Sequence, residues 1–507
     1  MPRLSRSSWS RAIELDVRTR ASAATSLLDR PLSAWWCVAG WVGSSAVFVM
    51  IVQSLGGPTV ADAEVPNVST WPIAHGQLSC AFPKNRIVTA PLYPFVSGAL
   101  SAVAHIGHGV PFPSRSALGP DCVDAYSAFV GWAVRADALH ATLLVGYVAW
   151  LALVAGTVSL LRASGRGRCG WEPATLLLLA SLPPVWMCMQ NFFHPHDLMA
   201  MGLTLGAVAA VRRNSWVTAG VLVALAMLTQ QFAILVAAPL FVVAPHGRKW
   251  VYAASACATL AVALVTLLVV SSSTAVDAAF LGSSNSAVSS TVLSSLHLHG
   301  GLRLYAARVV PVLLAMALAW WSDERLGPNV LEPVPLLSIV ALSLSLRLVF
   351  EVNMWGYYYM ALAVALVLVD VLSGRIRSTV VAWLVAVSIV YLVGPHTASD
   401  VWMDVSWGAQ AQHFLVPVAA ALAGALAVTY LARRSLAHGL VWLAVMVTAL
   451  LAWPVARNGI GNHVTGPWWQ AVLVAFGIAL AGRPLLAQTR AAKMREDAPS
   501  STSVALP

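Results

Sequence analysis

Long apolar segments recur from about residue 33 to residue 487 and are separated by short polar stretches. A helix needs roughly 20 apolar residues to cross a bilayer, and most of the segments approach that length. The segments that we expect to span the membrane are 33–55, 138–161, 174–190, 197–211, 215–229, 231–245, 250–271, 305–321, 333–350, 356–372, 378–394, 414–432, 438–455 and 468–486. The pattern therefore predicts an all-α, polytopic integral membrane protein with about 12–14 transmembrane helices.

The two ends of the chain differ from this apolar body. Residues 1–32 are rich in Arg and Ser and are expected to form a flexible tail, and the polar residues 488–507 are expected to be disordered. The first apolar run begins too far from the start and is too long to be a cleaved signal peptide. Residues 33–487 are thus predicted to form one transmembrane domain.

Composition supports a membrane protein and excludes a soluble enzyme. Hydrophobic residues make up 59% of the chain and charged residues only 10%, against about 25% charged in ordinary soluble domains. The net charge of +10 is carried mainly by arginine. In a membrane protein such a charge usually reports topology, so it is not interpreted as a nucleic-acid-binding surface.

Arginine clusters fall on one side of the predicted membrane. They lie in the N-terminal tail and at Arg162/Arg166/Arg168, Arg212/Arg213, Arg248/Lys249, Arg375/Arg377, Arg433/Arg434 and Arg490/Lys493/Arg495. Because positive loops stay inside, both termini are predicted to be cytoplasmic. For Arg212/Arg213 and Arg248/Lys249 to lie on the same side, the chain must cross the membrane twice between them. Residues 215–245 are therefore predicted to be a hairpin of two short helices with Gln230 and Gln231 at its outer tip.

The loops on the outer side are longer, and the outer face is where chemistry is expected. The longest runs over 56–137. Its segment 91–107 is apolar but contains Pro91, Pro94 and Gly98, so it is predicted to be an interfacial or re-entrant helix.

Two acids, Asp62 and Glu64, follow the first span. A carboxylate at this position meets lipid headgroups and water, and either one could act as a general base on an acceptor hydroxyl. The alternative is a solvated loop acid.

The sequence NFFHPHDLMAMG places His194, His196 and Asp197 at the outer end of two helices. Asp197 lies where a helix N-cap is expected, and the cluster could instead bind a divalent cation or a phosphate. Gln230 and Gln231, inside an apolar stretch, could bind a sugar or cap a helix break.

Arg347 lies at membrane depth, where an arginine is costly and is a functional candidate. Its guanidinium suits a phosphate, and it also stands four residues before Glu351, so an internal ion pair is compatible with that role. Tyr357 and Tyr358 fit an interfacial aromatic belt, with one ring available to a sugar. Cys80 and Cys122 are both predicted on the outer side and could form a disulfide.

The combination resembles the bacterial GT-C membrane glycosyltransferases, most closely the family 87 type that uses polyprenyl-phosphate mannose. The features that carry the resemblance are Asp62 after the first span with Gly76 and Phe82-Pro83 following, the His194–Asp197 turn, the helix pair RRNSWVTAGVLVALAMLTQQFAILVAAPL, and Arg347, Glu351, Tyr357 and Tyr358. They cover roughly residues 33–372. The stretch Asp62-Ala63-Glu64-Val65-Pro66 lacks the tyrosine usual in the family, which leaves Glu64 as a rival base.

The resemblance implies a GT-C-like core in a bacterial plasma membrane and a lipid-linked sugar phosphate as donor. Arg347, with His194 or His196, would stabilise the leaving phosphate, and Asp62 would deprotonate the hydroxyl of an envelope glycan or lipid acceptor, with inversion at the anomeric carbon. It implies no metal or other cofactor. The alternatives are a non-catalytic GT-C-like membrane protein and a transporter or flippase of a lipid-linked or small solute.

Overall fold

The computed structural model describes residues 28–54, 69–81, 90–106, 136–186, 188–189, 193–270, 300–350, 358–393, 407–433, 435–456 and 467–496. Within these ranges the chain is all-helical apart from one isolated β-bridge, Pro31–Cys169. The α-helices are α2 (Ala34–Ser54), α4 (Leu92–Ala104), α6 (Ala136–Ala163), α7 (Trp171–Ser181), α8 (Pro183–Trp186), α9 (Pro195–Arg212), α10 (Trp216–Met227), α11 (Ile234–Val243), α12 (His246–Val270), α15 (Gly300–Leu326), α16 (Pro333–Phe350), α17 (Tyr359–Leu372), α18 (Ser378–Val393), α19 (Trp407–Leu431), α20 (Leu436–Ala456) and α22 (Pro467–Glu496). Short 3-10 turns occupy Leu78–Cys80, Gln231–Ala233 (η4) and Gly327–Leu331.

Each expected span coincides with helix, but not each is one continuous helix. Among the described residues, six helical segments are long and apolar enough to cross a membrane, and seven more are apolar but shorter. The segment expected at 174–190 is broken into α7 and α8, because Leu182 is extended before Pro183 and Pro184. At the other end of the chain, α22 continues to Glu496, past the point where a disordered tail was expected, since the residues after Leu486 are good helix formers.

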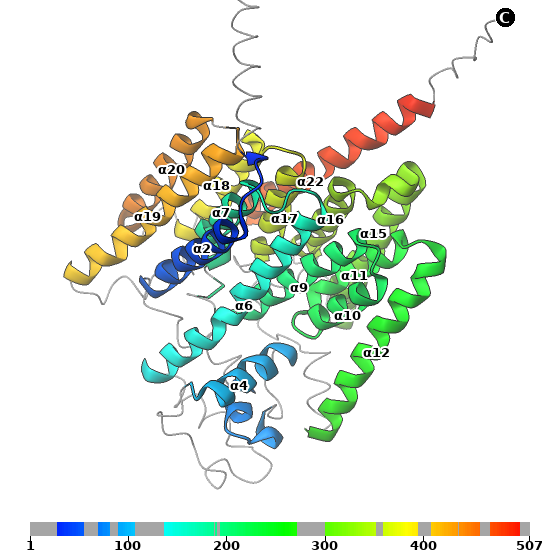
Figure 1. The fold of residues 1–507 in the computed structure, drawn as a ribbon, viewed down its shortest axis with the longest axis horizontal. Coiled ribbons are helices and arrows are strands. Elements are labelled where there is room, and N and C mark those ends of the chain that lie inside the picture. The colour runs from blue at the N-terminus through cyan, green and yellow to red at the C-terminus, as the bar shows by residue number, and fades with distance from the viewer. Residues whose placement is uncertain are drawn as a thin grey trace, which may run out of the picture.

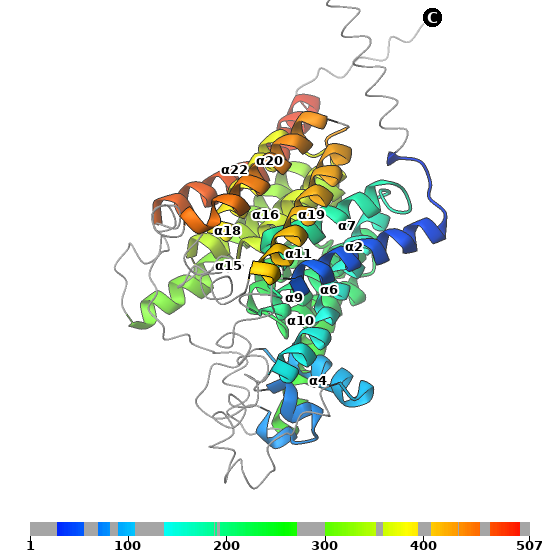
Figure 2. The ribbon, with the colours of Figure 1, turned by 90° about the vertical axis from the view of Figure 1, so that its left-hand side faces the viewer.

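Helices α17 and α9 form the centre of the bundle (Figures 1 and 2). Every residue of α17 is buried, and Asp370 is its one acidic or basic side chain. A helix that is apolar on all sides can be enclosed by lipid or by other helices, and the complete burial of α17 within the protein shows the second case. Helices α7, α8, α9, α16, α18 and α22 supply that cover for α17.

Glycines allow a close crossing between helices α6 and α9. A Cβ on Gly156 would lie 2.0 Å from the carbonyl oxygen of Gly202, and a Cβ on Gly202 would lie 2.3 Å from the carbonyl oxygen of Ala152. Small residues let backbones approach in this way in membrane bundles, where van der Waals packing drives association. The crossing fixes α9, which carries the His194–Asp197 turn at its start.

Charged side chains from separate connections gather at one end of the bundle. Buried Glu172 accepts hydrogen bonds from Trp41 Nε1 (2.7 Å), the Arg168 backbone N–H (2.9 Å) and two Arg162 nitrogens (3.2 Å each). Further contacts here are Arg166–Asp29 (3.0 Å), Arg433 Nε to the Gly374 carbonyl oxygen (3.3 Å) and Arg377 Nε to Asp370 (2.6 Å). The start of the described chain and the end of α22 lie at this end, which we call the arginine-rich end (Figures 1 and 2).

The opposite end holds α4, which packs on α6 and α9 (Figure 1). The backbone N–H of Leu92 donates to the Leu228 carbonyl oxygen (2.9 Å), so α4 meets the connection between α10 and α11. Helices α10 and α11 have 12 and 10 residues, about 18 and 15 Å at 1.5 Å per residue. They form two short arms joined at Gln230 and Gln231, with α4 against the joint.

Candidate functional site

The turn that begins α9 packs against α4, which lies at the end of the bundle opposite the arginine-rich end (Figure 1). Pro195 is the first helical residue, His194 is the N-cap residue and Asp197 is in the first turn. The expectation that Asp197 caps α9 is wrong, because no side chain caps this helix and the cap position is one turn earlier. Proline fits the first helical position, where its missing N–H leaves no bond unmade.

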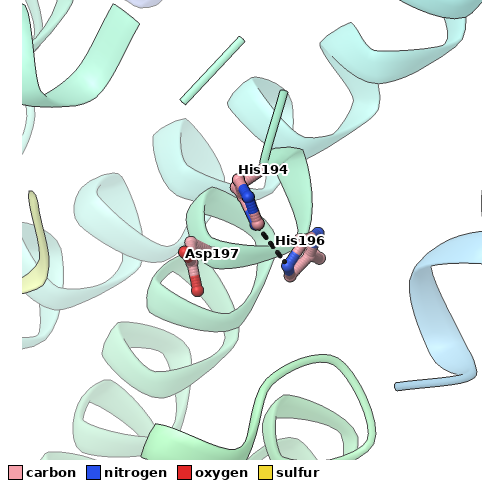
Figure 3. A group of neighbouring side chains, drawn as sticks. All are labelled: His194, His196 and Asp197. Atoms are coloured by element: carbon pink, nitrogen blue, oxygen red, sulfur yellow. Dashed lines mark hydrogen bonds between the residues drawn. The ribbon is translucent and has the colours of Figure 1, made fainter. Parts of the chain in front are cut away.

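His194 and His196 form a pair at this turn. His194 Nδ1 and His196 Nε2 are 3.1 Å apart, and the ring centroids are 4.9 Å apart at an interplanar angle of 61° (Figure 3). The ring of Tyr93, from α4, lies 6.2 Å from that of His196. Burial lowers the pKa of His194, which precedes α9, well below its ordinary value, and His196 and Arg347 act in the same direction. His194 is therefore neutral near pH 7.

Arg347, near the end of α16, reaches the same place. Its guanidinium carbon lies 3.8 Å from the Tyr358 ring centroid and 4.8 Å from that of Phe232. A guanidinium between two aromatic faces is held by cation–π attraction. One Nη of Arg347 lies 3.9 Å from Asp197 Oδ1, and the two side chains are 8% and 1% exposed.

The buried carboxylate of Asp197 lacks hydrogen bonds. Neither carboxylate oxygen has a hydrogen-bond partner, and Nδ1 of His196 has none either. Buried polar groups are nearly always hydrogen-bonded, because the cost of dehydration is otherwise not recovered. Within the described part of the chain, the Asp197 carboxylate makes an ion pair with Arg347 and accepts no hydrogen bond.

Gln230 and Gln231 directly precede Phe232, the residue whose ring contacts Arg347. Gln230 is the N-cap of η4, and its side-chain oxygen accepts a hydrogen bond from the backbone N–H of Gln231 (2.9 Å). Gln230 therefore caps a helix break, one of the two roles expected for it. Both glutamines are half-buried, and contact with a sugar stays a prediction.

Several predicted site residues fall outside the described residues, namely Asp62, Glu64, Glu351, Tyr357 and Cys122. The structure therefore does not test the expected Arg347–Glu351 pair or the choice of base. Cys80 is disulfide-bonded, and its pairing with Cys122 stays a prediction. Cys37, Cys169, Cys188 and Cys257 are free thiols.

Sequence reasoning missed Phe232 and Tyr93. Neither residue carries a signal of its own, because an aromatic residue beside a helix break is common in a membrane protein. Only the tertiary contacts with Arg347 and His196 identify them.

No family model matches this chain, and no curated protein matches it.

Proposed function

We propose that this chain is a membrane glycosyltransferase that moves a sugar, with mannose as the first candidate, from a polyprenyl-phosphate donor to an envelope glycan or lipid acceptor. The observation that carries the proposal is the meeting of Arg347 with the His194–Asp197 turn. These groups come from α16 and α9, about 150 residues apart in the sequence, and meet near the end of the bundle where α4 packs against α9.

The chemistry of these side chains suits a lipid-linked phosphate. Arg347 has a planar, permanently charged fork of donors that matches phosphate oxygens. Its aromatic neighbours Tyr358 and Phe232 exclude water, which strengthens the attraction for an anion. The lipid part of such a donor would remain in the bilayer while its phosphate meets Arg347.

The proposed reaction is a single displacement. The acceptor oxygen bonds to the anomeric carbon as the bond between that carbon and the phosphate oxygen breaks. The acceptor proton passes to Asp62 or Glu64, and polyprenyl phosphate leaves with Arg347 and a neighbouring histidine offsetting its charge. The sugar is transferred with inversion, and no nucleotide takes part.

The orientation follows from the charges. We place the arginine-rich end in the cytoplasm of a bacterium, with both termini on that side, because positively charged connections stay inside. The His194–Arg347 cluster then lies toward the extracytoplasmic end of the bundle, where polyprenyl-phosphate sugars would enter from the outer leaflet.

The test measures transfer of radiolabelled mannose from polyprenyl-phosphate mannose in membranes that contain the protein. Removing one donor to a developing negative charge typically costs about 10²–10³ in rate, so Arg347→Ala should lose about that factor. Arg308→Ala is the matched control, because Arg308 is an exposed arginine of α15. Unchanged transfer by Arg347→Ala would refute the role of Arg347. Asp62→Asn and Glu64→Gln, assayed side by side, decide which acid is the base.

A further inference from the structure

We propose that His194, His196 and Asp197 bind a divalent transition-metal ion, with Zn²⁺ the best match. The site is independent of the proposed function, because it is argued from the arrangement of the three side chains alone. It adds a cofactor that the sequence resemblance does not imply.

The first argument is the distance between potential ligand atoms. One ligand atom from each of the three residues lies within 4.8 Å of the others. His194 Nδ1 and His196 Nε2 are 3.1 Å apart, and two nitrogens at the usual Zn–N distance of about 2.05 Å then subtend about 100° at the ion, near the tetrahedral value. The two rings thus already have a spacing at which one ion can bind both.

The second argument is the Asp197 carboxylate. It is 1% exposed, and neither oxygen has a hydrogen-bond partner. Arg347 offsets part of the charge from 3.9 Å, but it is held over Tyr358 and Phe232 and donates no hydrogen bond to these oxygens. A dehydrated carboxylate with open lone pairs is a strong ligand for a cation.

The third argument is the backbone that carries the ligands. All three residues lie within one turn, at the start of a helix fixed by Pro195 and by the glycine crossing with α6. Figure 3 shows the histidine rings facing each other with Asp197 beside them. Ligands on tetrahedral zinc are about 3.4 Å apart, so binding needs Asp197 to rotate toward the pair and the two rings to turn from their mutual hydrogen bond toward the ion.

Three protein ligands leave one position of a tetrahedral ion open, as in catalytic zinc sites. The ion and Arg347 together would exceed the single negative charge of Asp197, so the open position favours an anionic oxygen. Phosphate is the chemical class that fits both the ion and the guanidinium. That this phosphate belongs to a lipid-linked sugar rests on the proposed function.

The test uses the full-length protein in detergent, purified through a tag without histidines and stripped with a chelator. We expect about one Zn²⁺ per chain by titration calorimetry and elemental analysis, and a visible absorption band on loading with Co²⁺. His196→Ala and Asp197→Asn should each weaken Zn²⁺ binding at least tenfold, beyond the low end of outer-shell effects. His246→Ala, which removes an exposed histidine of α12, should bind as the parent does.

A second variant gives a positive signal that a merely misfolded protein would not give. His196→Cys replaces an imidazole by a thiolate, which Zn²⁺ and Co²⁺ also bind, so the Co²⁺ form should gain a strong near-ultraviolet thiolate-to-metal band. Equal Zn²⁺ binding by His196→Ala and the parent, or no stoichiometric binding by the parent, would overturn the proposal. Zinc binding with unchanged sugar transfer in the variants would keep the metal site and separate it from the proposed function.

Discussion

Replacing Arg347 by Met should leave Asp197 as a buried charge without a nearby cation. The two groups are 3.9 Å apart and both are buried. With an effective dielectric constant of 20, unit charges at this distance attract by about 4 kcal/mol. Methionine keeps much of the side-chain volume, so the cost of the substitution is mainly the uncompensated carboxylate.

Thiol labelling under native conditions measures this cost. Cys188 is buried and free, and electrostatic interactions reach it from both Asp197 and Arg347. A loss of about 4 kcal/mol in the free energy of opening corresponds to about a thousandfold faster labelling of Cys188, since 1.4 kcal/mol is tenfold. Cys37, buried in α2, is an internal control and should keep its rate if the opening is local.

The double variant Arg347→Met/Asp197→Asn removes both charges and should return Cys188 to within about tenfold of the parent rate, because no lone buried charge remains. Parent-like labelling in Arg347→Met alone would refute the reasoning. It would mean that Asp197 does not depend on Arg347 for its charge balance.

Three further predictions concern the packing of the helices and their orientation in the membrane. Glu172→Ala should lower the free energy of unfolding by about 3–5 kcal/mol, read from Cys37 labelling, because it leaves Arg162 and the Trp41 and Arg168 N–H groups without their acceptor; a parent-like rate would contradict this. Gly202→Ala should lower the thermal midpoint of the monodisperse protein, since its Cβ would meet the Ala152 carbonyl, whereas Gly206→Ala on the same helix should stay close to the parent; equal midpoints would refute the tight crossing. Gly247→Cys at the arginine-rich end should be labelled by an impermeant maleimide only after cells are opened, and Ala104→Cys at the end of α4 should be labelled in intact cells; the reverse pattern would overturn the orientation.

The apolar pattern predicted where helices lie, because a helix in lipid must satisfy its own backbone and therefore shows its length in the sequence. It did not predict which helices are central. Helix α17 is no more apolar than α10, yet α17 is buried all round and α10 is not, since burial by protein and burial by lipid select similar residues.

The site was predictable only in part. His194, His196, Asp197 and Arg347 stand out in the sequence because polar residues are costly at membrane depth. Their meeting could not be derived, because the pairing of α9 with α16 depends on packing among many similar helices. The ion pair between Arg347 and Asp197, on two different helices, is therefore a contact that the sequence did not predict.

The 14 residues of α17 have a length of about 21 Å, less than the roughly 30 Å of a bilayer's hydrocarbon layer. A helix that falls short of the lipid thickness is tolerable here because protein, rather than lipid, encloses both of its ends. Arg347, beside Tyr358 at the start of this helix, is likewise enclosed by protein, with 8% of its side chain exposed. Under the proposed function, a prenyl-linked phosphate would have to enter the protein to reach Arg347, so the enclosure of Arg347 would select substrates by how far their polar part extends from the lipid.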